Sequence, residues 1–254
     1  MSDKKVGLQL FTLRSLLRNE AEIADTLKKV KAIGYANVQV SGVGKIEPKR
    51  LREILDENKL YPCSYHSMFI PITEKTDELI KLCKIVGYTN VACAVPPEEM
   101  MNAAGYKNIG KKLSKAGEVL LKNGITLVYH NHGFELMKYG GKSGLEIIYD
   151  ESDPKYLQTE LDTYWLAFGG ADPVAWINKY KNRCPIVHLK DMLVFYNQAR
   201  MCEVGNGNLN WKGIFEALKG TNCKWYVVEQ DTCGGHPLDS AKISFDNLKK
   251  MGIE

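Results

Sequence analysis

The chain has 254 residues, of which 44% are hydrophobic and 25% charged, an ordinary balance for a globular protein. Its net charge of +4 is small and its lysines are dispersed, so we expect no nucleic-acid partner. No apolar run approaches the roughly 18 residues of a membrane span, no signal-peptide core opens the chain, and seven cysteines form no CxxC pair, which together predict a cytoplasmic protein with buried, reduced thiols.

Short apolar runs alternate with longer helical patterns along the chain. The predicted strands are Val6–Leu10, Asn37–Val40, Tyr61–His66, Asn90–Val95, Ile125–His130, Leu157–Asp162, Pro185–Leu189 and Trp225–Glu229. The predicted helices are Ala21–Ile33, 49–59, Glu74–Val86, a long region from Pro96 to about Lys122, a short helix before Asp150, Asp172–Tyr180, Trp211–Lys219 and Leu238–Met251.

Eight strand–helix repeats without a long linker predict a closed (β/α)8 TIM barrel, with residues 1–254 forming a single domain. Repeated units of this kind need parallel strands joined by crossover helices. The alternative is an open, doubly wound sheet, but no GxGxxG follows an early strand. In TIM barrels the active site forms at the carboxyl ends of the strands.

Polar residues gather at those strand ends. In RCPIVHLKDM, His188 and Lys190 lie on one face because side chains alternate along a strand. An imidazole and an ammonium inside a barrel are costly unless they have partners or a task. The other strand-end candidates are Gln9, His66, His130, His132, Glu135, Asp162, Asp191, Glu229 and Asp231, with Trp165 as an apolar wall for a sugar ring.

Each candidate also has a structural explanation. A lone histidine is usually a satisfied core residue, and Asp162 could serve as a helix N-cap. Taken together, however, carboxylates and imidazoles make a mixed oxygen and nitrogen shell that suits Mn²⁺, Mg²⁺, Co²⁺ or Zn²⁺. We therefore expect one divalent metal ion at the mouth of the barrel.

The sequence resembles the xylose-isomerase-like TIM-barrel family of sugar isomerases and epimerases, which also includes inosose dehydratases. The matching segments occur in family order over nearly the whole chain. They are GLQLFTLR, YHNHGFE, ELDTYW, DPVAWINKY, VHLKDM, VGNGNLNW and VVEQD. The resemblance implies a small sugar or cyclitol as substrate and leaves room for a homo-oligomer.

The resemblance also implies a metal shell of Glu, Asp, His and Glu. Asp162, His188 and Glu229 match three of these positions, but Tyr129-His130 stands where many members have the first glutamate. We expect Glu135, in the loop beyond Gly133, to complete the shell. His130 or His132 could replace it, or the metal could bind more weakly.

Related epimerases move a proton beside a carbonyl with two metal-bound carboxylates. We therefore expect a metal-dependent isomerase or epimerase in which Glu229 is one base and Glu135, His130 or Lys190 is its partner. Gln9, His66, His132, Trp165, Asp191 and Asp231 are expected to bind substrate.

Other functions remain open on the sequence. β-Elimination by a dehydratase or lyase acting on a keto-sugar or keto-inositol would suit the same residues. A noncatalytic sugar-binding barrel would account for the missing glutamate, whereas five histidines poorly equip the chain for the multi-zinc cluster of an apurinic endonuclease. The glycine-rich segment Val204–Asn210 is better explained as a tight turn with an Asn cap than as a phosphate site.

Overall fold

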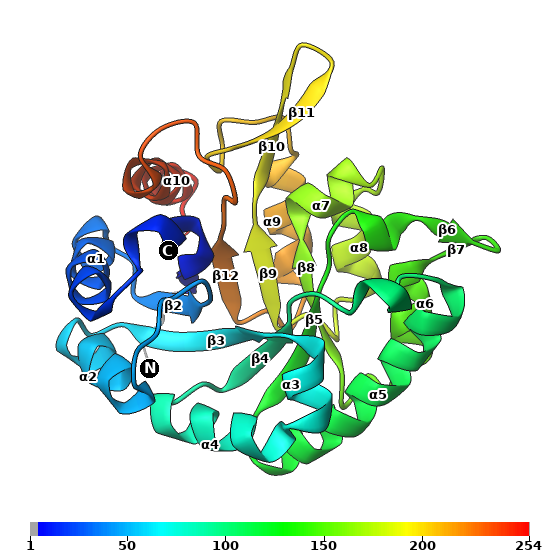
Figure 1. Ribbon diagram of the computed structural model, residues 1–254. Coiled ribbons are helices and arrows are strands. Elements are labelled where there is room, and N and C mark those ends of the chain that lie inside the picture. Colours follow the sequence, from blue (N-terminus) through cyan, green and yellow to red (C-terminus); the bar gives the residue numbers. More distant parts are fainter. Residues whose placement is uncertain (1–4, 254) are drawn as a thin grey trace.

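Eight parallel strands close on themselves in the computed structural model, which describes residues 5–253 (Figure 1). Around the barrel the order is β1-β12-β9-β8-β5-β4-β3-β2, so each strand lies beside its predecessor in the barrel and β1 closes against β12. The strands are β1 (Val6–Gln9), β2 (Asn37–Val40), β3 (Tyr61–Ser67), β4 (Asn90–Cys93), β5 (Thr126–His130), β8 (Gln158–Asp162), β9 (Ile186–Leu189) and β12 (Trp225–Val228). The predicted TIM barrel is confirmed.

Helices surround the barrel on its outside (Figure 1). They are α1 (Glu20–Ile33), α2 (Pro48–Glu57), α3 (Phe69–Glu74), α4 (Thr76–Val86), α5 (Ala103–Lys122), α6 (Gly144–Asp150), α7 (Thr163–Phe168), α8 (Pro173–Lys179), α9 (Trp211–Lys219) and α10 (Pro237–Lys250), with 3₁₀ turns η1 (Leu10–Leu16), η2 (Glu98–Met100) and η3 (Phe134–Leu136). Local chemistry sets their ends. Ser143 and Glu146 form a capping box at α6, and Gly87, with a φ of 89°, ends α4.

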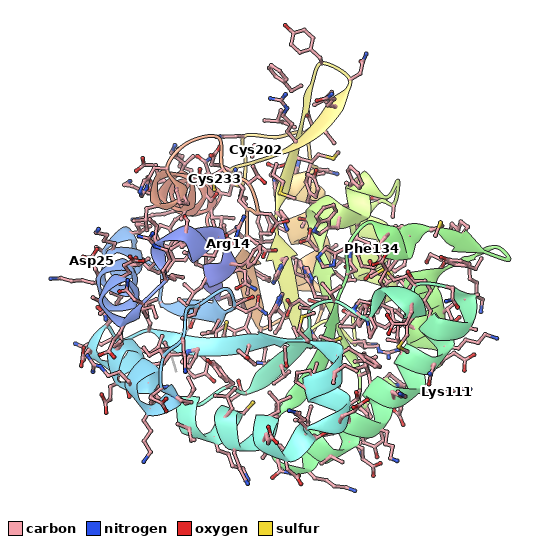
Figure 2. All side chains as sticks on the ribbon, viewed as in Figure 1. Arg14, Asp25, Lys111, Phe134, Cys202 and Cys233 are labelled. Carbon is pink, nitrogen blue, oxygen red and sulfur yellow. The ribbon has the colours of Figure 1, made fainter. Side chains whose placement is uncertain are left out.

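Some elements differ from the expectation. The helical region expected from Pro96 is divided into η2 and α5, because the Asn102 side chain accepts a hydrogen bond from the Gly105 N–H and starts a new helix there. The sequence also did not predict α3, α7 or two hairpins, β6 (Lys138–Tyr139) with β7 (Lys142–Ser143) and β10 (Asp191–Phe195) with β11 (Gln198–Cys202). Figure 2 shows the tip of the β10–β11 hairpin standing clear of the barrel.

The barrel interior has an apolar floor and a polar layer above it. The floor is a separate buried cluster of Cys63, Ala92, Val128, Ile186 and Val227. Above it the buried side chains are polar and come from β1, β2, β3, β8 and β9: Gln9, Gln39, Ser64, Glu160 and His188. Branched apolar residues normally fill TIM barrels, so this polar layer departs from the usual barrel core.

The cysteines and the membrane prediction can be checked over the described residues. All seven cysteines are free there, six are buried and Cys233 is half-buried. Among residues 5–253, no helix is both long and apolar enough to span a membrane.

Candidate active site

Three neighbouring strands, β8, β9 and β12, carry the polar residues into the barrel at successive heights. Along β9, Ile186 lies in the floor and His188 and Lys190 follow at two-residue steps, as the alternation predicts. Asp162 pairs in register with His188 across the β8–β9 ladder. The strand register therefore places carboxylates of the neighbouring strands beside the imidazole at the mouth.

Four buried side chains form a group that could hold a metal ion: His130, Asp162, His188 and Glu229. One donor atom from each lies within 4.8 Å of all the others. His188 Nδ1 is 3.0 Å from a Glu229 oxygen and 3.7 Å from Asp162 Oδ2, and His130 Nε2 is 3.4 Å from that same Asp162 oxygen. The structure thus brings together the three ligands that the family pattern implied, with His130 as the fourth donor.

Glu135, expected to complete the shell, lies outside this group among the described residues. The η3 turn directs its carboxylate back toward strand β5, where it accepts hydrogen bonds of 2.8 Å from the Tyr129 hydroxyl and from the His132 N–H. The side chain is fully buried, and burial raises the pKa of Glu135 to about 7. Its contacts therefore assign it to holding the loop that carries His132.

Lys190 is the buried cation of the site. Its side chain is 1% exposed, and its ammonium lies 2.9 Å from Glu229 Oε2, 2.8 Å from Asp231 Oδ2 and 3.4 Å from Asp162 Oδ2. Burial disfavours the charged form, but these three carboxylates outweigh it and hold the pKa of Lys190 above its usual range. The same ammonium lies 5.3 Å from the centre of the Trp165 ring, a cation–π contact.

Two residues of the site, Glu160 and Gln39, were not predicted from the sequence. Glu160 and Gln39 are fully buried and face the other nitrogen of His188, with Nε2 at 2.7 Å from Glu160 Oε1 and 2.6 Å from Gln39 Oε1. The available signal was spacing, because Glu160 lies two residues before Asp162 and must share its inward face. Burial lowers the pKa of His188, but Glu160 and Glu229 reverse the effect and raise that pKa well above the ordinary value.

Two residues expected to bind substrate lie in this polar layer. Gln9 donates a 2.9 Å hydrogen bond to Gln39. The His66 Nε2 atom lies 2.7 Å from Glu160. Both residues support Glu160 and Gln39, and their positions beneath the mouth fit support better than direct contact with substrate.

Asp191, also expected to bind substrate, makes its hydrogen bonds with a neighbouring loop and with Trp211. Its carboxylate is buried and accepts hydrogen bonds from the N–H groups of Gly205 and Gly207 and from the Trp211 indole. It anchors the glycine-rich segment that follows β11. The Asn210 side chain caps α9 by accepting from the Gly213 N–H, as the turn-and-cap explanation predicted.

Aromatic side chains line the mouth where the loop after β5 meets α7. His132 stacks on Phe134 with ring centroids 5.4 Å apart and lies 5.4 Å from Trp165. Figure 2 shows Phe134 on the α7 side of the mouth and Arg14 on the η1 side. Three buried nitrogens, Nδ1 of His130, Nδ1 of His132 and Nε1 of Trp165, have no hydrogen-bond partner among the described residues. Unpaired donors and acceptors at one wall suit the hydroxyl groups of a polar ligand.

The charge balance of the site fits a divalent cation. Three carboxylates, those of Asp162, Glu229 and the partly exposed Asp231, surround the Lys190 ammonium, and a fourth, that of buried Glu160, faces His188. Even with His188 protonated the group keeps excess negative charge, which is costly in a buried site. Two imidazoles and two carboxylates at one point supply the donors that a transition metal prefers.

Comparison with known proteins agrees with this architecture. The family model of xylose isomerase-like TIM barrels matches residues 27–251. An inosose dehydratase from Clostridium tetani is 30% identical over 156 residues, 54% of this chain and 51% of that protein. The chain thus spans about half the length of the curated relatives it matches.

Two solved structures show the same fold. A sugar phosphate isomerase/epimerase from Parabacteroides distasonis superimposes with a TM-score of 0.83 at 23% identity, covering 98% of this chain and 94% of that one. An IOLI protein with a binding zinc atom superimposes with a TM-score of 0.72 at 14% identity, covering 98% and 96% of the two chains.

Proposed function

This chain belongs to the xylose isomerase-like TIM-barrel family, and on that premise we propose that it is a metal-dependent enzyme that removes a proton beside the carbonyl of a keto-sugar or keto-cyclitol. We further propose that the reaction ends in loss of water, so that the enzyme is a dehydratase. One observation carries this choice: Glu229 and Asp231 both contact the Lys190 ammonium, which brings two carboxyl groups together at the mouth of the barrel.

Glu229 is the proposed base. Burial opposes its charged form, but Lys190 and His188 outweigh burial and hold the pKa of Glu229 well below its ordinary value. The carboxylate is therefore ionised at neutral pH and ready to accept a proton. A divalent ion held by His130, Asp162, His188 and Glu229 would polarise the substrate carbonyl and make the neighbouring C–H bond more acidic.

Asp231 is the proposed acid. Burial and the charge of Glu229 raise the pKa of Asp231 to about 6, so a protonated fraction exists near neutral pH. A pair of carboxyl groups with separated pKa values is a common way to provide one base and one acid. Both groups contact one ammonium, which suits proton removal and hydroxyl protonation on the same side of the substrate.

The substrate we propose is not phosphorylated. The glycine-rich segment could have cradled an anion, but Asp191 already occupies its N–H groups. Lys190 is committed to three carboxylates. The uncommitted nitrogens of His132 and Trp165 suit hydroxyl groups instead, and inosose dehydratase, the name of the C. tetani relative, denotes a reaction on a keto-cyclitol.

The test is a panel of keto-inositols, ketoses and 3-keto-glycosides incubated with the protein and Mn²⁺, Co²⁺ or Zn²⁺ in D₂O. We expect a conjugated dehydration product, seen by ultraviolet absorption, and deuterium entering the substrate beside the carbonyl. Asp231→Asn should slow dehydration at least ~100-fold while keeping the deuterium exchange, because the base remains. Glu229→Gln should lose both reactions.

Other outcomes identify the alternatives. Deuterium exchange with interconversion of epimers and no loss of water would make the protein an isomerase or epimerase, with His130 or His132 acting opposite Glu229. Dehydration by Asp231→Asn at the parental rate would refute the proposed acid. A protein purified without chelator should contain one metal per chain, and His188→Ala should lose it while staying folded. A parent that binds no metal and processes no ketone would be the noncatalytic sugar-binding barrel.

A further inference from the structure

Glu160 lies below the proposed metal ligands and touches no open part of the mouth. It is fully buried, yet its carboxylate is surrounded by polar contacts. The His66 and His188 Nε2 atoms both lie 2.7 Å from Oε1, and Gln39 donates a 2.9 Å hydrogen bond to Oε2. A buried carboxylate with this many hydrogen-bond partners indicates a role beyond packing.

The surroundings of His188 decide which of its nitrogens carries a proton. Its Nε2 faces two oxygens, Glu160 Oε1 at 2.7 Å and Gln39 Oε1 at 2.6 Å. Gln39 presents its oxygen there because its amide nitrogen is committed to Glu160 and Ser64. Two acceptors at these distances exclude a bare lone pair on Nε2, so this nitrogen must carry hydrogen.

The other nitrogen then faces the metal group. His188 Nδ1 points to Glu229 and Asp162, the two carboxylates of that group. Once Nε2 holds its hydrogen against Glu160, the Nδ1 lone pair is the one available to an ion. A carboxylate behind a ligating imidazole fixes the ring and increases its donor strength.

We propose that Glu160 is the positioning residue of the metal centre: through its contact with His188 Nε2 it sets the ring so that Nδ1 binds the ion. The proposal rests on the metal site of the proposed function, and it assigns a role to a residue that the ligand pattern leaves out. His66, from β3, contacts the same Oε1 atom of Glu160 as His188 and holds the carboxylate in place.

A second arrangement of the same residues is the competing explanation. The donor atoms of His66, Glu160 and His188 also lie within 4.8 Å of one another and could hold an ion themselves. In that case Nε2, not Nδ1, would bind the metal. We favour the upper group because Glu160 is already saturated with hydrogen bonds, whereas the upper group lies at the strand ends that open to substrate.

The test compares Glu160→Gln and Glu160→Leu with the parent. Zn²⁺ affinity is measured by competition with a chromophoric chelator, and the histidine tautomers by long-range ¹H–¹⁵N correlation with ¹⁵N-histidine. Because replacing a residue that hydrogen-bonds a metal-ligating imidazole typically costs about 10–100-fold in metal affinity, we expect about that loss for Glu160→Gln. The glutamine can still accept from Nε2, so His188 should keep its tautomer there and lose it, with a larger affinity loss, in Glu160→Leu.

A matched control is Glu135→Gln, which neutralises another fully buried glutamate that does not touch His188. Its Zn²⁺ affinity should stay within about threefold of the parent. Parental Zn²⁺ affinity in Glu160→Gln would overturn the inference, even if Glu160→Leu fails to fold. Zinc bound to Nε2 of His188, with binding abolished in Glu160→Gln, would place the ion in the lower group. A parent that binds no zinc would instead refute the metal site of the proposed function.

Discussion

Replacing Lys190 with methionine should destabilise the metal-free protein by about 3–5 kcal/mol at pH 7, the usual cost of breaking a buried ion pair from one side. A single contact at 2.9 Å is worth about 6 kcal/mol of Coulomb attraction at an effective dielectric constant of about 20. The cost of burying the ammonium, several kcal/mol, offsets much of the attraction to its three partners. Methionine has a similar length, so lost packing contributes little and the uncompensated carboxylates dominate.

The dependence on pH separates this explanation from loss of packing. Lys190 helps to hold the pKa values of Asp162 and Glu229 below their ordinary values despite burial, which raises them. A lowered carboxyl pKa stabilises the fold above the unfolded pKa of about 4, and that stability is lost as the pH falls further. The parent should therefore lose its advantage over Lys190→Met below about pH 4.

Urea unfolding at pH 7 and pH 3.5, with and without Zn²⁺, measures these differences. Saturating Zn²⁺ should recover part of the loss, because the ion supplies charge to the same carboxylates. Lys142→Met is the matched control, since Lys142 makes an equally short ion pair with Asp150 at the surface, with side chains 64% and 50% exposed. That variant should change stability by less than about 1 kcal/mol. Equal stability of Lys190→Met and the parent at pH 7 would refute the reasoning.

Three further predictions concern the frame around the site. Asp191→Asn should cost about 3 kcal/mol in urea unfolding, because an amide NH₂ would face the N–H donors that the carboxylate accepts; unchanged stability would contradict its anchoring role. Gly117→Ala should destabilise the protein by about 2 kcal/mol despite better helix propensity, because the new Cβ would overlap the Tyr156 carbonyl oxygen. The control Gly234→Ala meets only open space, and its stability should stay within about 0.5 kcal/mol of the parent. Glu135 has a raised pKa of about 7, so its contribution to stability should fall by up to ~3 kcal/mol as the pH rises from about 4.5 to 7. Glu135→Gln should flatten this slope of stability against pH. An unchanged slope would mean that another group titrates in that range.

Periodicity was enough to predict the barrel. Strands with two buried faces and helices that end at glycines, such as α1 at Gly34, leave patterns that survive in a single sequence. The two hairpins and α7 did not leave such patterns, because their elements are only two to six residues long, too short for a periodicity to show. Boundaries moved by only a few residues, as with α2, which ends at Glu57.

The site was harder to predict than the fold. Ligand types at strand ends could be read from spacing, and Asp162, His188 and Glu229 do converge. The direction of a loop side chain could not be read from spacing. The Glu135 side chain points toward Tyr129, because its carboxylate accepts two hydrogen bonds there. Glu160 and Gln39 were missed because a single polar residue inside a strand reads as an exposed position until its neighbours are known to face inward.

The barrel interior has two layers: an apolar floor that holds the strands together and, above it, the residues that we propose to bind substrate. The apolar floor of Cys63, Ala92, Val128, Ile186 and Val227 is complete without any residue of the mouth. On the proposed function, substitutions around His132 and Trp165 should therefore change what is recognised while the floor continues to hold the strands in register. If the proposed function holds, laboratory selection for new specificity should begin at that aromatic wall and leave the floor untouched.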